Sequence, residues 1–536
     1  VILSGADLSS AADWKDLGDG LFSHPWTEQW GHFTYRWGPP EPLGHRREMV
    51  IVDGQPLRQM VLERYDYDGH SYDDRRGAQD IRWQYREFLD PKTTLAPGAF
   101  GVAERAANGA ALFVKVADPD AFRKATVEIA RRRQILVLSD KENLVVRNLT
   151  FQHAANDFRN VRREGPLTIG AKARNILIED CRFLWNNFDG LPIGGSDITL
   201  RRVEASYNGF GGFAHGASNL LVEDCVTNFN NWRGHWGGQR SWNMGGFKFG
   251  APDQDRITIR RHTAVGNLCP GVWSDIHPKN VRVEDSVIAL NDRIGLFFEL
   301  SHGPHLAERC LLVHNATSQY TSMVAGITEI RDSVMFGDSV EQAGRHRLQT
   351  PVAQLTWYIR QSDHARMGRL EPEVARMTGN VVAGGPRQAM LVQVHNGTRR
   401  DDPRYEKWKI DLANNVFSGP TNEAFVYNDR NWGWHIVQLA PFTSQLKLSQ
   451  NQMADVKFEN PQQLDFRVQS DSPVAGRKEL PLKQLDAAWI SRTRAFFDWA
   501  GYDGGPLVVR QFDPRAQRDH SPPQIPADTR LGPPCS

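Results

Sequence analysis

The chain has 536 residues, with 64 Lys and Arg against 63 Asp and Glu and a formal net charge of +1. This balance excludes the strongly basic surface of a nucleic-acid or membrane-surface binder. A hydrophobic content of 40% among mixed charges excludes global disorder, and no apolar run approaches the ~18 residues of a membrane span.

The first 140 residues predict two parts before the main body of the protein. Residues 1–46 are rich in Trp, Pro, His and Gly, and we expect this segment near the active site. Residues 47–140 contain hairpin signals at Asp53-Gly54 and Asn108-Gly109, each beside short apolar strands. They predict a small N-terminal β-sandwich-like domain.

A repeat follows, with starts at residues 143, 175, 197, 219, 256, 280 and 304 and spacings of 32, 22, 22, 37, 24 and 24. Each repeat opens with Ile, Val or Leu alternating with polar residues, as in 175–181, which predicts a half-buried strand. The Leu-x-x-Leu-x-Leu frame of a leucine-rich repeat is absent. We therefore predict an all-β protein built on a right-handed parallel β-helix with coils ~4.8 Å apart.

The β-helix is expected over residues 141–475, with weaker late coils near Asn380 and Asn414. Residues 476–536 are expected to form a C-terminal part, with an amphipathic helix over 482–500 and a Pro-rich tail.

Three cysteines, Cys181, Cys225 and Cys310, occupy one inward column of the repeat. Cys181 and Cys225 lie two coils apart, about 9–10 Å from the strand spacing, which exceeds the reach of a disulfide. We predict buried free thiols, and the cysteine spacing does not fit a zinc site.

The second strand of each coil carries the candidate chemistry. Aligning these strands places a set of glycines and two acids at one position: Gly194, Gly216, Gly250, Asp275, Glu299 and Gly326. Strand alternation puts this position on the outer face, with Lys248, Trp273 and Phe297 beside it. We interpret the surface as a groove cleared of side chains by glycine, with Asp275 and Glu299 as its floor.

Carboxylates on adjacent coils, ~4.8 Å apart, approach the ~5–5.5 Å separation of a retaining glycosidase rather than the ~6.5–9.5 Å of an inverting one. Like charges this close raise the pKa of one partner, so an acid and a nucleophile can coexist. Solvated acids or a calcium site are the alternatives. The flanking Trp273 and Phe297 and the aromatic loop over 232–242 favour sugar binding.

Two segments, Gly271-Val-Trp-Ser-Asp275 and Phe297-Phe-Glu-Leu-Ser-His-Gly-Pro304, resemble the right-handed β-helix glycoside hydrolases, most of all the β-xylosidase-type glycoside hydrolase family 120. The resemblance is strongest over 245–305. It implies Asp275 as nucleophile and Glu299 as general acid/base.

Further candidate residues have structural alternatives. Lys248 could contact substrate or cover apolar surface, His302 and His277 could contact substrate or pack in turns, and Arg293 could reach the groove rim or sit in a coil turn. The two remaining candidates, expected to wall the pocket or to pack the inserted loop, are Trp236 and Trp242.

We therefore predict a retaining, exo-acting glycoside hydrolase of plant, algal or bacterial glycans that needs no cofactor. Its substrate is an oligosaccharide or glycoside, without nucleic acid or membrane partners, and homo-oligomers are compatible with the sequence. One alternative is a β-helix polysaccharide lyase in which the acids hold Ca²⁺ and Lys248 abstracts a proton; another is a non-catalytic carbohydrate-binding solenoid. We expect a secreted or periplasmic bacterial protein; no signal-peptide pattern is visible in the sequence from Val1 onward.

Overall fold

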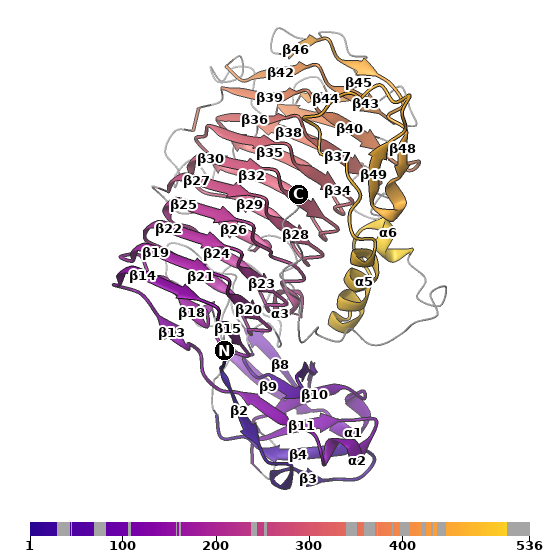
Figure 1. Ribbon diagram of the computed structural model, residues 1–536. Helices are drawn as coiled ribbons and strands as arrows, with labels where there is room; N and C mark the ends of the chain where they lie inside the picture. The colour runs from indigo at the N-terminus through magenta and orange to yellow at the C-terminus, as the bar shows by residue number, and fades with distance from the viewer. Residues whose placement is uncertain are drawn as a thin grey trace.

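A long stack of parallel strands forms the body of the protein, with a separate β-domain at its N-terminal end and a helix along one flank (Figure 1). The computed structural model describes residues 1–28, 43, 46–68, 82–105, 109–156, 158–159, 162–236, 244–250, 254–338, 351–357, 370–371, 373–388, 390–396, 407–419, 425–429, 433–436 and 446–511.

Three sheets run along the stack. The 11-stranded sheet contains β14 (Glu142–Arg147), β19 (Arg174–Glu179), β22 (Ser196–Arg201), β25 (Ser218–Glu223), β27 (Asp255–Arg260), β30 (Lys279–Glu284), β33 (His305–Glu308), β36 (Ile327–Arg331), β39 (Val374–Thr378), β42 (Lys409–Ala413) and β46 (Leu446–Ser449). The 10-stranded sheet contains β21 (Leu191–Ile193), β24 (Phe213–His215), β26 (Phe247–Phe249), β29 (Val272–Ser274), β32 (Leu296–Ser301), β35 (Tyr320–Ala325), β38 (Ala353–Trp357), β41 (Val392–Asn396), β44 (Phe425–Asp429) and β45 (Gly433–Ile436).

The third sheet is in two blocks, joined where Val226 bridges Glu204 and Thr263. The first block contains β1 (Ile2–Ser4), β15 (Thr150–Gln152), β20 (Arg182–Leu184) and β23 (Glu204–Ser206). The second contains β28 (Thr263–Val265), β31 (Val287–Ala289), β34 (Leu311–Val313), β37 (Val334–Gly337), β40 (Val381–Gly384), β43 (Val416–Ser418) and β47 (Gln452–Met453).

The alternation seen in the sequence forms the core of this stack. Ile176 and Ile178 of β19 are buried inside it, while Asn175 of the same strand is exposed. The predicted parallel β-helix is confirmed, including its late coils. Cys181, Cys225 and Cys310 are buried and free, as predicted for their column, and Cys269 outside that column is also buried and free.

Side-chain amides stack along one corner of the β-helix, a feature that the sequence analysis did not identify. Each carboxamide donates to the next, at 2.8–3.1 Å, through Asn186, Asn208, Asn230, Asn267, Asn291 and Asn315. Because each amide also bonds the backbone of a neighbouring coil, the ladder satisfies buried polar groups at the corner and fixes the coil register.

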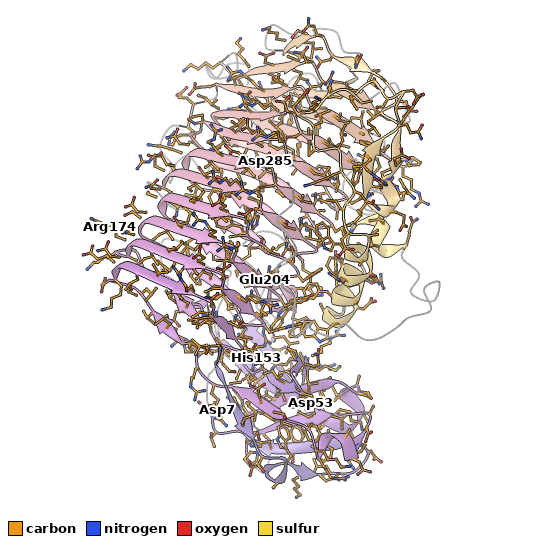
Figure 2. The ribbon with its side chains drawn as sticks, in the orientation of Figure 1. Asp7, Asp53, His153, Arg174, Glu204 and Asp285 are labelled. Carbon is orange, nitrogen blue, oxygen red and sulfur yellow. The ribbon has the colours of Figure 1, made fainter. Side chains whose placement is uncertain are left out.

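The N-terminal domain is a two-sheet sandwich, as predicted. One sheet contains β3 (Lys15–Asp16), β4 (Leu21–Pro25), β11 (Ala111–Lys115), β10 (Ala99–Ala103) and β7 (Arg58–Val61), and the other contains β2 (Ala6–Ser9), β12 (Val127–Ala130), β5 (Val50–Val52) and β6 (Gln55–Pro56). The turn residue Asp53, labelled in Figure 2, and Gly54 have φ of 49° and 75°, which fits the predicted hairpin turn. Asn108 lies outside the described residues.

Residues 1–46 are not a segment apart from this domain. Strand β1 pairs with β15 at the first coil, and β2 to β4 complete the two sheets of the sandwich. These strands belong to the sandwich because their apolar side chains complete its core. Phe22 of β4, for example, packs in the core cluster that contains Val114 and Ile129.

A C-terminal helix, α5 (Ala488–Ala500), lies against the flank of the β-helix, within the predicted 482–500 (Figure 1). Every helix in the described part of the chain is too short or too polar to cross a membrane. The remaining elements are β8 (Glu63–Asp68), β9 (Arg82–Phe88), β13 (Leu136–Val137), β16 (Phe158–Arg159), β17 (Arg162–Arg163), β18 (Leu167–Thr168), β48 (Phe458–Asn460), β49 (Asp465–Val468), α1 (Pro91–Thr94), α2 (Pro119–Phe122), α3 (Trp232–Trp236), α6 (Leu507–Arg510) and two 3₁₀ turns, Ala11–Asp13 and Pro461–Gln463.

Two histidines inside the β-helix make its stability depend on pH. His262 and His305 are buried, and burial lowers the pKa of each to about 3. Both are neutral in the folded and unfolded states above pH ~6.5. Below that pH the unfolded chain takes up protons that the folded protein does not, so stability falls as pH falls.

We therefore expect the free energy of unfolding to decrease between pH 7 and pH 5 by about 2 kcal/mol for each of these histidines. Urea denaturation of the wild type and of His262→Leu at both pH values checks this. In the variant, the decrease in the free energy of unfolding from pH 7 to pH 5 should be smaller by about 2 kcal/mol than in the wild type, whatever the stability of the variant at pH 7. An equal pH dependence in the two proteins would contradict the prediction.

Candidate active site

The two candidate acids lie on neighbouring strands of the 10-stranded sheet. Strands β26, β29 and β32 pair in register, with Lys248 opposite Trp273 and Trp273 opposite Phe297. The same register, continued past Ser274 and Phe298, places Asp275 beside Glu299. The sequence alignment of these two coils is therefore confirmed.

The acids are on the outer side of the strands but are not exposed. Val272, Leu296 and Phe298 point into the β-helix core, so alternation directs Asp275 and Glu299 away from it. Asp275 is only 7% exposed and Glu299 only 3%. The expected open groove floor is wrong in this respect, because strand alternation sets the direction of a side chain and not what covers it.

The two carboxylates have different partners. The Nζ atom of Lys248 lies 2.9 Å from Oδ2 of Asp275, while Oδ1 of Asp275 is buried without a hydrogen-bond partner. The indole Nε1 of Trp273 donates to Oε2 of Glu299 at 3.1 Å. Asp275 therefore pairs with a cation through one oxygen and has no hydrogen bond to the other. Glu299 accepts a hydrogen bond from a neutral donor.

Trp273 is enclosed by its neighbours. The Lys248 ammonium lies 3.3 Å from the centre of its ring, and Phe297 stacks on it at 5.3 Å with an interplanar angle of 20°. Since β29 lies between β26 and β32, the two neighbours take opposite faces of the indole. Trp273 and Phe297 are 2% and 0% exposed, so the prediction that they stack on a sugar is corrected: Trp273 holds Lys248 and Glu299 instead.

The glycines before the acids serve the packing of the coils. A Cβ atom on Gly250 would lie 1.7 Å from the carbonyl oxygen of Asp275, and one on Gly194 would lie 2.9 Å from that of Ile169. Glycine is therefore required by close backbone approach rather than by an open surface. The register also corrects the sixth position, because Glu299 pairs with Met323 and not with Gly326.

Two predicted histidines lie just beyond the acids. The rings of His277 and His302 are 5.2 Å apart, and the His277 amide donates to the carbonyl of Leu300. Burial, and to a smaller extent the Lys279 ammonium, lowers the pKa of His302. His277 follows Asp275 by two residues and His302 follows Glu299 by three, so the two rings meet just after the acids in the chain.

Arg293 and Trp236 are elsewhere. Arg293 lies beside Asp292, 3.9 Å from its carboxylate, and within the described chain no ion pair joins it to either acid. Trp236 donates through Nε1 to the carbonyl of Ala500 and packs against Trp499, because the inserted α3 docks on α5. Both are corrected to structural roles, and Trp242 lies outside the described residues.

The N-terminal segment, expected near the active site, is not beside the acids where it is described. Strand β1 pairs with β15 in the first coil. Asp275 directly follows β29 and Glu299 lies on β32, which are the third and fourth strands after β21 in the 10-stranded sheet.

Two strands that the sequence analysis passed over continue the same outer face. Polar residues alternate with core residues in Ala353-Gln-Leu-Thr-Trp357 and Val392-Gln-Val-His-Asn396. The alternation of polar and apolar residues could have identified these strands from the sequence. The repeat spacing becomes irregular after residue 340, so they were not recognised as coils.

A family profile described as a right-handed β-helix region matches residues 134–328. The chain shares its fold with a solved structure described as the complex of XylC with xylose, at 12% identity and a TM-score of 0.54, over 85% of this chain and 76% of that one.

Two further solved structures are less alike. An Azotobacter vinelandii mannuronan C-5 epimerase, the AlgE4 A-module, has 16% identity and a TM-score of 0.42 over 59% of this chain and 76% of its own. A structure described as a glycoside hydrolase has 9% identity and a TM-score of 0.35 over 84% and 82%. A search of the curated proteins gives no match. The chain is therefore a right-handed parallel β-helix protein, and its likeness to XylC is a likeness of fold.

Proposed function

We propose that this protein is a retaining, exo-acting glycoside hydrolase with Asp275 as nucleophile and Glu299 as general acid/base. The observation that carries the proposal is the pairing of two buried carboxylates on adjacent strands in which Oδ2 of Asp275 is held by Lys248 and Oδ1 is unpartnered. Adjacent strands lie ~4.8 Å apart, near the ~5–5.5 Å carboxyl separation of retaining enzymes.

In the first step, Oδ1 of Asp275 forms a bond to the anomeric carbon while the bond from that carbon to the leaving oxygen breaks. Glu299 gives its proton to the leaving oxygen. In the second step, Glu299 takes a proton from water as the water oxygen displaces Asp275 from the anomeric carbon. Two displacements at one carbon retain its configuration, and the mechanism uses no cofactor.

Lys248 has a positioning role in this mechanism. Its ammonium contacts both the Asp275 carboxylate and the Trp273 ring, so it fixes one oxygen of the nucleophile and leaves the other directed to substrate. Replacing Lys248 with Met, which keeps the length of the stem, is expected to lower kcat by roughly 10- to 100-fold with a smaller effect on KM. Steady-state kinetics with an aryl glycoside measures this, and an unchanged kcat would remove Lys248 from the site.

The same contacts bear on the lyase alternative. A lyase would need Lys248 as a neutral base, but a carboxylate at 2.9 Å and an aromatic face both favour the charged ammonium. Calcium takes 6–8 oxygen ligands, and among the described residues no group of three or more His, Cys, Asp or Glu is placed to hold a metal. Hydrolysis is therefore the better account of the site.

The substrate class that we propose is a neutral oligosaccharide or glycoside, with xylosides first, since XylC was solved with xylose. A panel of nitrophenyl glycosides tests the activity, and proton NMR of the first product tests the mechanism. The expected product has the anomeric configuration of the substrate. An inverted product, or an unsaturated sugar detected by its ultraviolet absorbance, would refute the retaining mechanism.

A further inference from the structure

The outer face of the 10-stranded sheet continues past Glu299 with polar side chains. Thr321, Gln354 and Gln393 follow Phe297 in register on β35, β38 and β41. Two residues further along each strand, Met323, Thr356 and His395 follow Glu299 in register. Leu355, Trp357, Val392 and Val394 point into the core, so alternation places these polar residues on the face that carries the acids.

Two of these polar side chains, one with a fully buried hydroxyl, make no hydrogen bond within the described part of the chain. Thr356 is 5% exposed, and its Oγ1 atom is buried without a hydrogen-bond partner. Gln393 is also 5% exposed, and among the described residues its carboxamide makes no hydrogen bond. A buried polar group without a hydrogen-bond partner is unfavourable, so the unpaired Thr356 hydroxyl indicates a place for a polar ligand.

The opposite direction along the sheet is apolar. Ala214 lies next to Lys248 in register and belongs to a small buried cluster with Phe188, Phe210 and Met244. The rings of Phe188 and Phe210 stack at 4.2 Å. The side chains of this cluster offer no hydrogen-bond partner to the hydroxyl groups of a sugar. A sugar chain that extends from the acids is therefore better accommodated toward β38 and β41.

We infer that Thr356 and Gln393 form a binding subsite for the leaving-group part of an oligosaccharide. The inference rests on the proposed function, because it is Glu299 that protonates the leaving oxygen and Glu299 is the acid on the β38 side. Thr356 lies two strands from Glu299, about 10 Å away by the strand spacing. Its neutral hydroxyl and the Gln393 amide suit sugar hydroxyls, and the apolar cluster keeps the sugar-donor side short, as exo action requires.

Binding of saccharides of increasing length tests the subsite. Asp275→Asn protein, which should not turn substrate over, is titrated calorimetrically with xylose, xylobiose, xylotriose and xylotetraose, and with the matching glucose and mannose series. We expect affinity to rise with length in one series. Adding Thr356→Val or Gln393→Leu should weaken binding of the trisaccharide about 3- to 10-fold each and leave binding of the monosaccharide unchanged.

Thr378→Val is the matched control, because Thr378 ends β39 on another sheet of the same coil, and it should change neither affinity. Equal affinity for all lengths, a length effect that survives both substitutions, or no binding in any series would overturn the subsite. Failure of the proposed function is a separate result: Asp275→Asn would then retain turnover of aryl glycosides, while the dependence of binding on Thr356 and Gln393 could still be measured.

Discussion

Replacing Asp275 with Asn should lower kcat by at least ~10³-fold, on the scale of losses measured when an enzyme's nucleophile is removed. The amide cannot form the glycosyl ester, and it also loses the charge that pairs with Lys248 at 2.9 Å. Steady-state kinetics with an aryl glycoside gives the loss. Asp255→Asn, one coil earlier on the 11-stranded sheet, is the control and should retain wild-type kcat.

A cavity-forming variant, Asp275→Gly, makes this prediction specific to a nucleophile. Azide added to this variant should occupy the space of the carboxylate and displace the leaving group in one step. The product is then a glycosyl azide of inverted configuration, which NMR distinguishes from its anomer. Full activity of Asp275→Asn, or no azide product from Asp275→Gly despite a folded protein by circular dichroism, would contradict the role of Asp275.

Replacing Glu299 with Gln should produce a loss that depends on the leaving group. General acid catalysis contributes about 10²- to 10⁴-fold, and the loss should approach this size for an oligosaccharide, whose leaving alkoxide needs a proton. A nitrophenolate leaves readily without one, so glycosylation of the enzyme should be affected much less with that substrate. The second step still needs a base, so a burst of nitrophenol before slow turnover is expected.

Rapid-mixing measurements of nitrophenol release, compared with oligosaccharide hydrolysis, check this prediction. Glu329→Gln on β36 is the matched control, since Glu329 is on another sheet near the same coil. Losses of equal size for both substrates, without a burst, would show that Glu299 is not the general acid. Together, the Asp275 and Glu299 variants separate the two chemical roles, which a single inactive variant cannot do.

The two carboxylates of the acid pair have different neighbours, which supports the different roles proposed for them. The Lys248 ammonium forms an ion pair with the Asp275 carboxylate, and the Trp273 indole donates a neutral N–H to Glu299. Because the indole is held between Lys248 and Phe297, its N–H has a fixed direction. The aromatic residues at this site thus orient the charged groups, which is a different use from the sugar platform that their sequence positions suggested.

Much of the fold was predictable because a β-helix repeats its local pattern. The alternation at 175–181 and 219–225 and the 22-residue step between 175, 197 and 219 predict stacked strands, and the structure pairs those strands in register. The charge at equivalent positions of these strands also alternates between positive and negative from one coil to the next. For example, the Arg202 guanidinium donates to the Asp180 carboxylate of the preceding coil. Figure 2 labels Asp285, which accepts from Arg309 in the same manner.

Sequence alone determined the all-β repeat, the free cysteines and the placement of Asp275 beside Glu299, because each depends on local periodicity and on a constant strand spacing. Only the tertiary structure decided that the acids are buried, that Lys248 and Trp273 hold them, that Trp236 packs on α5, and that Met323 rather than Gly326 follows Glu299. These depend on contacts between residues far apart in sequence and on loops of unequal length. A repeat pattern carries no information about such contacts.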